Sequence, residues 1–380
     1  MKGNIVAMQN WKIKRMAVLA VVVLSAIIVS SKPIEVGVYA GTGPRSNGCV
    51  EWFRLVNASP EMNLTLLDGD AVRSGALDKI ELLVMPGGSS PAIKKDLQPE
   101  GTAKLKDFIR NGGGYIGTCA GCCLMMEESA DVTRGISVMP YGRLGSKGKF
   151  MMPLAVNETG AKAMGIKPGE YKVRYSAGPV LYPTTNAIEG ASFEVWGTFA
   201  SDFDCPKSKL RMNGHAAIIG GTYGKGRVFA IACHPESFPV THFMLKGAFR
   251  YVAGREVTFP PRHRAVRALS VGFYSPVICG TEVARTVVAL DNLKGVDLFP
   301  VAAQEIDSGM LDHIDWLVLP DGVDSRYSSL EGKKEFVDAF LSRGGRMAGW
   351  GVGAKHLPKD GKVCTSGADV VSFLEMEAAK

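Results

Sequence analysis

The sequence predicts an α/β protein built on a doubly wound parallel sheet, followed by a smaller α/β unit of the same kind. Apolar segments of strand length alternate with amphipathic segments along the chain, the pattern of parallel strands joined by right-handed helical crossovers. Glycine makes up 45 of the 380 residues and clusters at the ends of these segments, where tight strand-to-helix turns need it. The chain is 46% apolar, enough to bury a core and too apolar for a disordered protein.

The strands expected in the first part of the chain are short apolar runs bounded by polar residues, glycine or proline. They cover residues 34–39, 64–67, 80–85 and 115–117. A helix is expected to begin near Glu51, and a second at residues 102–110 carries Leu105 and Ile109 on one face. The glycines at 112–114 directly after this second helix end it.

The same order of segments recurs further along the chain at a nearly constant offset, which drifts only from 235 to 232 residues. The matching segments are 271–274 with 36–39, 314–322 with 80–88, 336–341 with 104–109, and 347–353 with 115–121. The last match places Gly351 at the position of Cys119. This pattern indicates an internal duplication. The alternative is a pair of unrelated α/β domains that share a common pattern of strands followed by glycines.

The two copies define the expected domain boundaries. Residues 32–258 form the first domain and residues 265–380 the second, with residues 1–31 as a separate segment. Pro260 and Pro261 lie between the two domains, where they forbid regular structure. About 140 residues follow the matched region of the first copy and fewer than 30 follow that of the second, so the second is a degenerate partial repeat.

Residues 1–31 have the pattern of a secretory signal. The basic stretch 12–15 precedes an apolar run at 16–29, and two serines follow. The run has 14 residues, fewer than the ~20 that span a bilayer. We expect a periplasmic or extracellular protein, with the segment either cleaved or retained as a membrane attachment through residues 16–29. The alternative is that the protein begins at Met16 or later.

Charge and cysteine content exclude several classes of partner. Removing the four basic residues of the first 31 from the total of 44 leaves 40, against 37 acidic residues, a net charge of +3. No run of five basic residues is present, so we expect no nucleic-acid partner. The eight cysteines are too sparse for a disulfide scaffold, and the Cys-x-x-Cys at 119–122 lacks a second pair that would bind zinc. We therefore expect neither a metal nor a cofactor.

The segment around Cys119 has the features of a nucleophile elbow with cysteine in place of serine. Cys119 follows a short strand and precedes a helix, with Gly117 and Gly121 on either side. Small neighbours permit the sharp turn that an elbow requires. The helix N-terminus favours a thiolate, and the N–H of Ala120 can stabilise an oxyanion.

The ends of two other strands supply partners for this cysteine. His234 ends a buried strand, and Glu236 lies two residues further on. Because the carboxyl ends of parallel strands share one edge, His234 can act as the base of Cys119 while Glu236 orients the imidazole. Gly87 and Gly88 end the strand at 80–85 and are candidates for a second oxyanion donor.

These motifs resemble those of the class I glutamine amidotransferase-like superfamily and, more closely, the biotin-protein ligase N-terminal domain family. The resemblance covers about residues 34–255 and rests on Gly117–Gly121 with His234–Glu236, Met85–Gly88, Gly112–Tyr115, Tyr175–Pro179 and Tyr223–Arg227. It implies a flavodoxin-like sheet and a Cys-His-Glu triad, but no particular reaction. Biotin ligation is not implied, because nothing in the sequence resembles the ligase's catalytic domain. Tyr175 and Ser176 are candidates for lining the pocket, with an edge-strand role as the alternative.

Two functions remain open from the sequence. The first is a cysteine-dependent hydrolase or amidotransferase-like enzyme acting on a small-molecule or peptide-like amide. Amidotransferases of the superfamily feed ammonia to a synthase, and an exported protein lacks the ATP that such a synthase consumes. Hydrolysis is therefore expected rather than transfer. The second is a non-catalytic binding or assembly protein that retains the fold, which the loss of the nucleophile in the second copy favours.

Overall fold

The structure is a computed structural model that describes most of the chain after residue 31. The described residues are 32–45, 47–128, 134–145, 148–202, 210–260, 269–275, 279–322 and 328–380. The predicted signal at residues 1–31 and the start of the second predicted domain lie outside them. No helix within the described ranges is long and apolar enough to cross a membrane.

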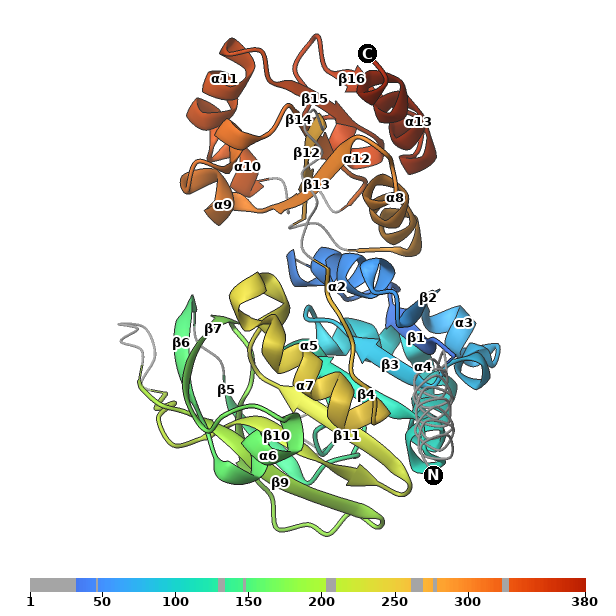
Figure 1. Ribbon diagram of the computed structural model, residues 1–380, viewed down its shortest axis with the longest axis vertical. Coiled ribbons are helices and arrows are strands. Elements are labelled where there is room, and N and C mark those ends of the chain that lie inside the picture. Colours follow the sequence, from blue (N-terminus) through green and yellow to red (C-terminus); the bar gives the residue numbers. More distant parts are fainter. Residues whose placement is uncertain are drawn as a thin grey trace, which may run out of the picture. The chain divides into compact units, whose positions relative to one another are not determined.

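The first sheet begins with a parallel half that confirms the predicted α/β fold (Figure 1). Its strands, in spatial order, are β2 (Met62–Leu67), β1 (Ile34–Tyr39), β3 (Leu82–Met85), β4 (Gly114–Thr118) and β11 (Gly226–Ile231). Every neighbouring pair is parallel. The chain winds outward from β1 to β2 and then returns to β3 and β4, so the sheet is doubly wound and the carboxyl ends of its strands share one edge.

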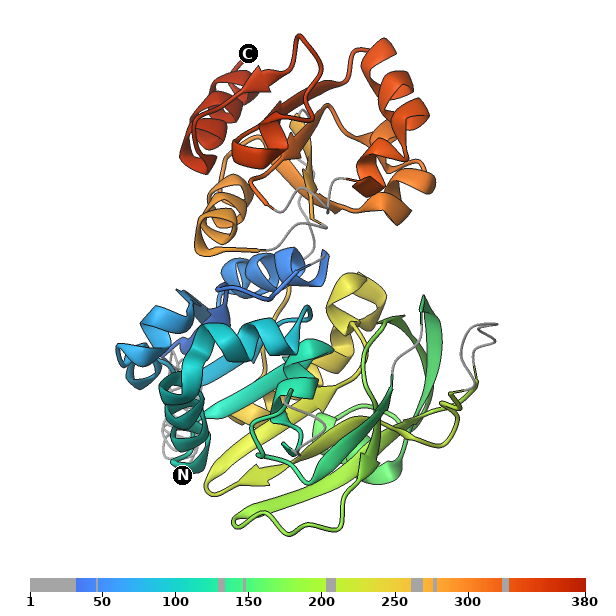
Figure 2. The same cartoon turned by 180° about the vertical axis from the view of Figure 1, so that it is seen from behind.

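Helices cover both faces of this parallel half. They are α2 (Asn47–Ala58), α3 (Gly69–Arg73), α4 (Ser90–Arg110), α5 (Ala120–Met125), α6 (Glu158–Met164) and α7 (His242–Ala253). Figures 1 and 2, seen from opposite sides, show α2 and α7 on one face and α4 on the other. Side-chain alternation along the strands divides the core accordingly: Val36 and Val38 pack with α2 and α7, whereas Tyr39 and Leu83 pack with α4 and α5.

Helix α4 is longer than the predicted helix at 102–110, because it already begins at Ser90. The Ser89 side chain caps it by accepting a hydrogen bond from the Ala92 N–H. Gln98 interrupts the helix with a φ of 59° and a ψ of 174°, directly before Pro99. Proline disfavours helical backbone at the residue that precedes it, which explains why the two halves of α4 meet at a kink.

Beyond β11 the sheet continues with antiparallel strands that the sequence pattern did not predict. They are β10 (Ala216–Tyr223), β9 (Ala191–Phe199), β6 (Lys149–Val156) and β7 (Gly169–Ser176), with β5 (Tyr141–Gly145) and β8 (Val180–Pro183) beside β10. β6, β7 and β9 have mostly exposed or half-buried positions on one face, so their apolar pattern is weak. This extension brings the end of β7 to the edge where β4 and β11 end.

The second sheet has the strand order β13 (Val296–Val301), β12 (Leu269–Tyr274), β14 (Trp316–Leu319), β15 (Arg346–Gly349) and β16 (Lys362–Val363), all parallel. Its helices are α8 (Thr281–Asp291), α9 (Ala303–Asp307), α10 (Ser328–Glu331), α11 (Lys334–Ser342), α12 (Gly351–Ala354) and α13 (Gly367–Ala378). We call this part, residues 269–380, the second unit, and residues 34–259 the first unit. The order repeats that of β2-β1-β3-β4-β11. Duplication stays a prediction, because unrelated parallel α/β proteins can also share a strand order.

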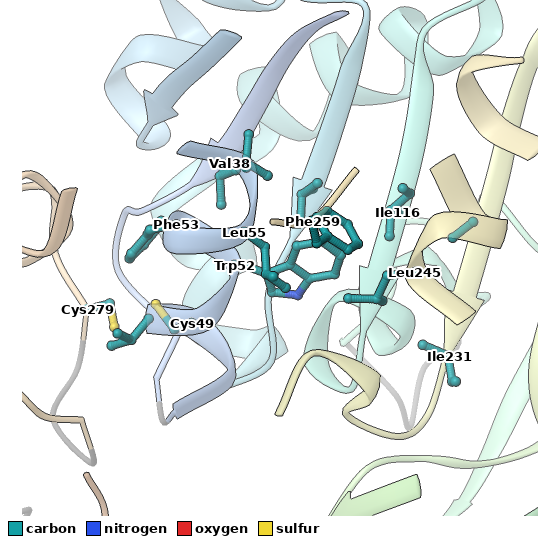
Figure 3. Close-up of a cluster of buried hydrophobic side chains, with 14 of the residues drawn as sticks. Val38, Cys49, Trp52, Phe53, Leu55, Ile116, Ile231, Leu245, Phe259 and Cys279 are labelled. Atoms are coloured by element: carbon teal, nitrogen blue, oxygen red, sulfur yellow. The ribbon is translucent and has the colours of Figure 1, made fainter. Parts of the chain in front are cut away.

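Helix α2 belongs to the first unit and also packs against the second. It forms one side of the site described below. Trp52 lies beneath it among the strands of the first sheet, while Cys49 faces Cys279 of the second unit (Figure 3). The Arg54 guanidinium donates a 2.8 Å hydrogen bond to Asp291 at the end of α8. The first and second units accordingly form one compact body, residues 34–380.

Candidate active site

Cys119 occupies the corner between β4 and α5, as an elbow requires. Its backbone has a φ of 51° and a ψ of −102°, a conformation that residues with a side chain rarely adopt. Its N–H donates a 2.8 Å hydrogen bond to the Ile231 carbonyl at the end of β11. This bond ties the corner to the strand that leads into His234.

The two glycines beside Cys119 are needed because the backbone packs closely there. A Cβ on Gly121 would lie 2.1 Å from the Met85 carbonyl oxygen, and one on Gly117 would lie 2.7 Å from the Gly121 carbonyl carbon. Real Cβ atoms do not approach backbone this closely, so only glycine lets α5 start directly over the ends of β3 and β4. The Tyr115 hydroxyl donates a 2.8 Å hydrogen bond to the Gly121 carbonyl and fixes the turn.

The structure brings His234 and Glu236 together at the same edge. The distance between His234 Nδ1 and Glu236 Oε1 is 2.8 Å, and both side chains are buried. Burial alone would lower the pKa of His234, but the negative charges of Glu236 and Cys119 outweigh it and raise the pKa to about 10. The other ring nitrogen, Nε2, is buried and forms no hydrogen bond of good geometry with a described residue, although the nearby Cys119 side chain interacts with the ring and raises its pKa. Nε2 is therefore the ring nitrogen that is left to exchange a proton with Cys119.

Glu236 is held by residues that the sequence analysis missed. The Thr118 hydroxyl lies 3.5 Å from Glu236 Oε1, and Trp52 Nε1 lies 3.3 Å from the same hydroxyl. A Cβ on Gly48, at the start of α2, would lie 2.2 Å from Glu236 Oε1. Thr118 could have been suspected from its place in the elbow, whereas the contact of Gly48 depends on tertiary packing alone. His242 adds a 3.1 Å contact from Nε2 to the Glu236 carbonyl.

Gly87 and Gly88 lie at the elbow in different roles. A Cβ on Gly87 would lie 2.5 Å from His234 Cε1 and 3.2 Å from Cys119 Cβ, so Gly87 borders both groups directly. Gly88 has a φ of 151°, and a Cβ there would lie 2.1 Å from the Gly43 carbonyl oxygen, so this position requires glycine. The Gly87 carbonyl accepts a 3.0 Å hydrogen bond from the Arg45 N–H, which fixes the orientation of this turn.

In the second unit, two backbone N–H groups at the corresponding strand-to-helix corner donate hydrogen bonds to the same oxygen atom. Gly351 has a φ of 56° and follows β15 as Cys119 follows β4. One carboxylate oxygen, Asp321 Oδ1, accepts hydrogen bonds from the N–H groups of Gly322 at 2.9 Å and Val352 at 2.8 Å.

In sequence order these two donors correspond to Gly88 and Ala120 of the first unit, and Asp321 corresponds to Gly87. Two N–H groups at equivalent positions can therefore converge on a single oxygen. Gly87 has no side chain, so in the first unit it supplies no carboxylate at the position that Asp321 Oδ1 occupies in the second.

Tyr175 and Ser176 contribute differently from expectation. Tyr175 is buried against Phe150 and Phe199, and its hydroxyl donates a 2.6 Å hydrogen bond to the Gly178 carbonyl. Its side chain therefore packs in the core and does not line a pocket. Ser176 approaches the site through its backbone, since its carbonyl oxygen lies 3.7 Å from Cys119 Sγ.

The cysteines near Cys119 lack features of a nucleophile. Burial raises the pKa of Cys122 and Cys233 well above the usual thiol value, and it raises that of Cys123 to about 12. All of the described cysteines are free thiols. Within the described residues, no group of three or more His, Cys, Asp or Glu side chains could hold a metal ion.

Comparison with known proteins supplies the family. The family described as "Biotin-protein ligase, N terminal" matches residues 34–128. Pyridoxal 5'-phosphate synthase subunit PdxT of Dehalococcoides mccartyi is 30% identical over 132 residues, which cover 33% of this chain and 67% of that protein. An uncharacterised protein of Chlamydia muridarum is 31% identical over 74 residues, 19% of this chain and 29% of its own length.

Solved structures also match, at low sequence identity. A putative ThuA-like protein of Bacteroides uniformis aligns with a TM-score of 0.43 at 13% identity, over 60% of this chain and 94% of that one. A putative GMP synthase component of Thermoplasma acidophilum aligns with a TM-score of 0.39 at 16% identity, over 59% and 96%. On the sequence matches to PdxT and to the biotin-protein ligase family, the chain belongs to the class I glutamine amidotransferase-like superfamily.

Proposed function

We propose that this protein is a cysteine-dependent hydrolase of amide or peptide-like substrates. The observation that carries the proposal is the 2.8 Å contact between His234 and Glu236, beside a cysteine held at a strained strand-to-helix corner. This arrangement supports the assignment of Cys119 as nucleophile, His234 as base and Glu236 as orienting carboxylate.

In the first half of the proposed reaction, the Cys119 thiol proton passes to His234 Nε2 and the sulfur bonds to the substrate carbonyl carbon. Because Glu236 Oε1 accepts a hydrogen bond from the Nδ1–H group, Nε2 is the nitrogen that faces the reaction. The N–H groups of Gly88 and Ala120 hold the oxyanion, as their counterparts hold Asp321 Oδ1. Nε2 then gives its proton to the leaving nitrogen, the C–N bond breaks and a thioester remains.

In the second half, water attacks the thioester while His234 Nε2 takes a proton from it. The carbon–sulfur bond breaks, the acid leaves and the thiol is restored. The raised pKa of His234 suits this role, because the imidazolium form stabilises a thiolate and carries the proton needed by the leaving amine. We also propose that residues 1–31 export the protein, either cleaved or retained as a membrane attachment.

Selective alkylation tests the proposed nucleophile. With limiting iodoacetamide, peptide mapping is expected to find Cys119 modified before the other cysteines, because Cys119 is the one described cysteine that interacts with the His234 imidazolium. Cys123 is the matched control: it lies on the adjoining helix and has a similar exposure, 8% against 6%, but no such partner. His234→Ala is expected to slow Cys119 alkylation at least about tenfold. Equal rates at the two cysteines would refute the proposal and favour a binding protein.

A further inference from the structure

A cavity of about 410 Å³ lies beside β6 and β7, with walls from both units. Its lining includes the apolar residues Met151, Phe238 and Met310 and the charged residues Lys149, Arg174 and Glu305. Its volume lies in the range of small-molecule sites. One aromatic ring and two thioethers among these residues provide an adaptable apolar surface, which suits an aromatic or aliphatic group.

Strand β7 connects this cavity to the proposed nucleophile. The Ser176 carbonyl lies 3.7 Å from Cys119 Sγ, and Arg174, two residues earlier, lines the cavity. Residues two apart on a strand share a face and are separated by roughly 7 Å. Lys149 pairs with Ser176 across the β6–β7 ladder and also lines the cavity. The cavity therefore begins about one strand repeat away from Ser176, the β7 residue that contacts Cys119.

The charges in the cavity favour a carboxylate. Arg174 donates a 3.0 Å hydrogen bond to Glu305, and both side chains are largely buried. Glu305 is itself fixed, because its other oxygen accepts a 3.1 Å hydrogen bond from the Ala302 N–H. Lys149, exposed at the start of β6, is a second cation in the lining, and it has no acidic partner among the residues that the structure describes. An anionic ligand could pair with it.

Two of the residues that line the cavity adjoin His234. The His234 N–H donates a 2.7 Å hydrogen bond to the Arg174 carbonyl, and Phe238, another lining residue, follows directly after the histidine turn. Because His234 protonates the leaving nitrogen in the proposed reaction, the group released as an amine lies on the side of the imidazole. In an N-acyl amino acid, a single carbon atom joins that nitrogen to the carboxylate, so the carboxylate lies on the same side as the leaving nitrogen.

The geometry points to a substrate pocket for the amine half of an N-acyl amino acid, with an apolar side chain between Met151, Phe238 and Met310 and a carboxylate near Lys149. This inference rests on the proposed function and names its substrate class. It also gives the second unit a role, since Glu305 and Met310 close a pocket that the first unit alone leaves open.

Two affinity labels test the pocket without requiring turnover. N-iodoacetyl-L-phenylalanine carries the expected side chain and carboxylate, and N-iodoacetyl-L-phenylalaninamide lacks only the charge. We expect the carboxylate label to modify Cys119 at least about tenfold faster than the amide label. Lys149→Met should abolish this preference. Lys172→Met is the matched control, because it removes the same charge from the neighbouring strand β7 without touching the cavity, and it should keep the preference.

A second comparison tests Met310, which lines the cavity from the second unit. Met310→Ala should lower the preference for N-iodoacetyl-L-phenylalanine over N-iodoacetylglycine several-fold, because it removes apolar surface from the pocket. If both phenylalanine labels react with Cys119 at equal rates, the pocket assignment is wrong while the nucleophile stands. If no label reacts at Cys119 but iodoacetamide does, the pocket assignment is also wrong. If Cys119 reacts with none of these reagents, the proposed function fails.

Discussion

Replacement of Cys119 by alanine is expected to lower hydrolysis of a reactive ester or amide at least about 10³-fold. The sulfur forms the covalent intermediate, so its loss leaves only the contributions of the oxyanion donors and of substrate binding. The measurement is release of 4-nitrophenol from 4-nitrophenyl acetate, with Cys123→Ala as the control on the adjoining helix. Full turnover by Cys119→Ala would contradict the proposed mechanism and favour a binding function.

The same position should show an opposite effect on stability. Cys119 has a φ of 51°, a strained value for a residue with a side chain, and Gly351 of the second unit has a φ of 56°. Cys119→Gly is therefore expected to raise the free energy of unfolding by about 1 kcal/mol while abolishing activity, and Gly351→Cys to lower it by a similar amount. Urea unfolding measures both changes. A clear loss of stability in Cys119→Gly would mean that the elbow is not strained.

Glu236→Gln is expected to lower turnover by roughly 10²- to 10⁴-fold, because the amide does not hold the imidazolium in its charged and oriented form. The substitution nearly preserves volume, so packing against Gly48 and Thr118 changes little. Glu170→Gln, an exposed change on β7, is the control. Wild-type activity in Glu236→Gln would show that Glu236 has no part in the reaction.

The same substitution should alter the dependence of stability on pH. The pKa of His234 rises from about 6.5 in the unfolded chain to about 10 in the folded one. A group with a raised folded pKa stabilises fully below its unfolded pKa, and this stabilisation is lost as the pH rises toward the folded value. The free energy of unfolding of wild type should thus fall between about pH 6.5 and 10, by at most about 1.4 kcal/mol per pH unit. Glu236→Gln should flatten that slope.

The elements that the sequence predicted share a local signal. Strand β1 and the corner at Cys119 are marked by short apolar runs that end in glycine, a pattern set by neighbouring residues. His234 and Glu236 could be found for the same reason, because their strand and the histidine turn are contiguous in the sequence. The geometry then followed from one rule, that the ends of parallel strands lie at one edge of the sheet.

The features that the sequence did not predict depend on packing between distant segments. The contact of Gly48 with Glu236 and the bond between Arg174 and Glu305 join residues far apart in the chain. Tyr175 was predicted as a possible pocket residue, but its place in the alternation of β7 turns the ring into the core. The antiparallel strands carry a weak apolar pattern, so their pairing could not be read from periodicity.

Trapping the acyl intermediate tests the central claim most directly. The full-length protein is mixed with 4-nitrophenyl acetate, quenched in acid during turnover and mapped by mass spectrometry. We expect one acetyl group on Cys119, removable by hydroxylamine as a thioester should be, and none in Cys119→Ala. Turnover without an adduct on Cys119, or an acetyl group on another cysteine instead, would contradict the assignment of Cys119 as the nucleophile.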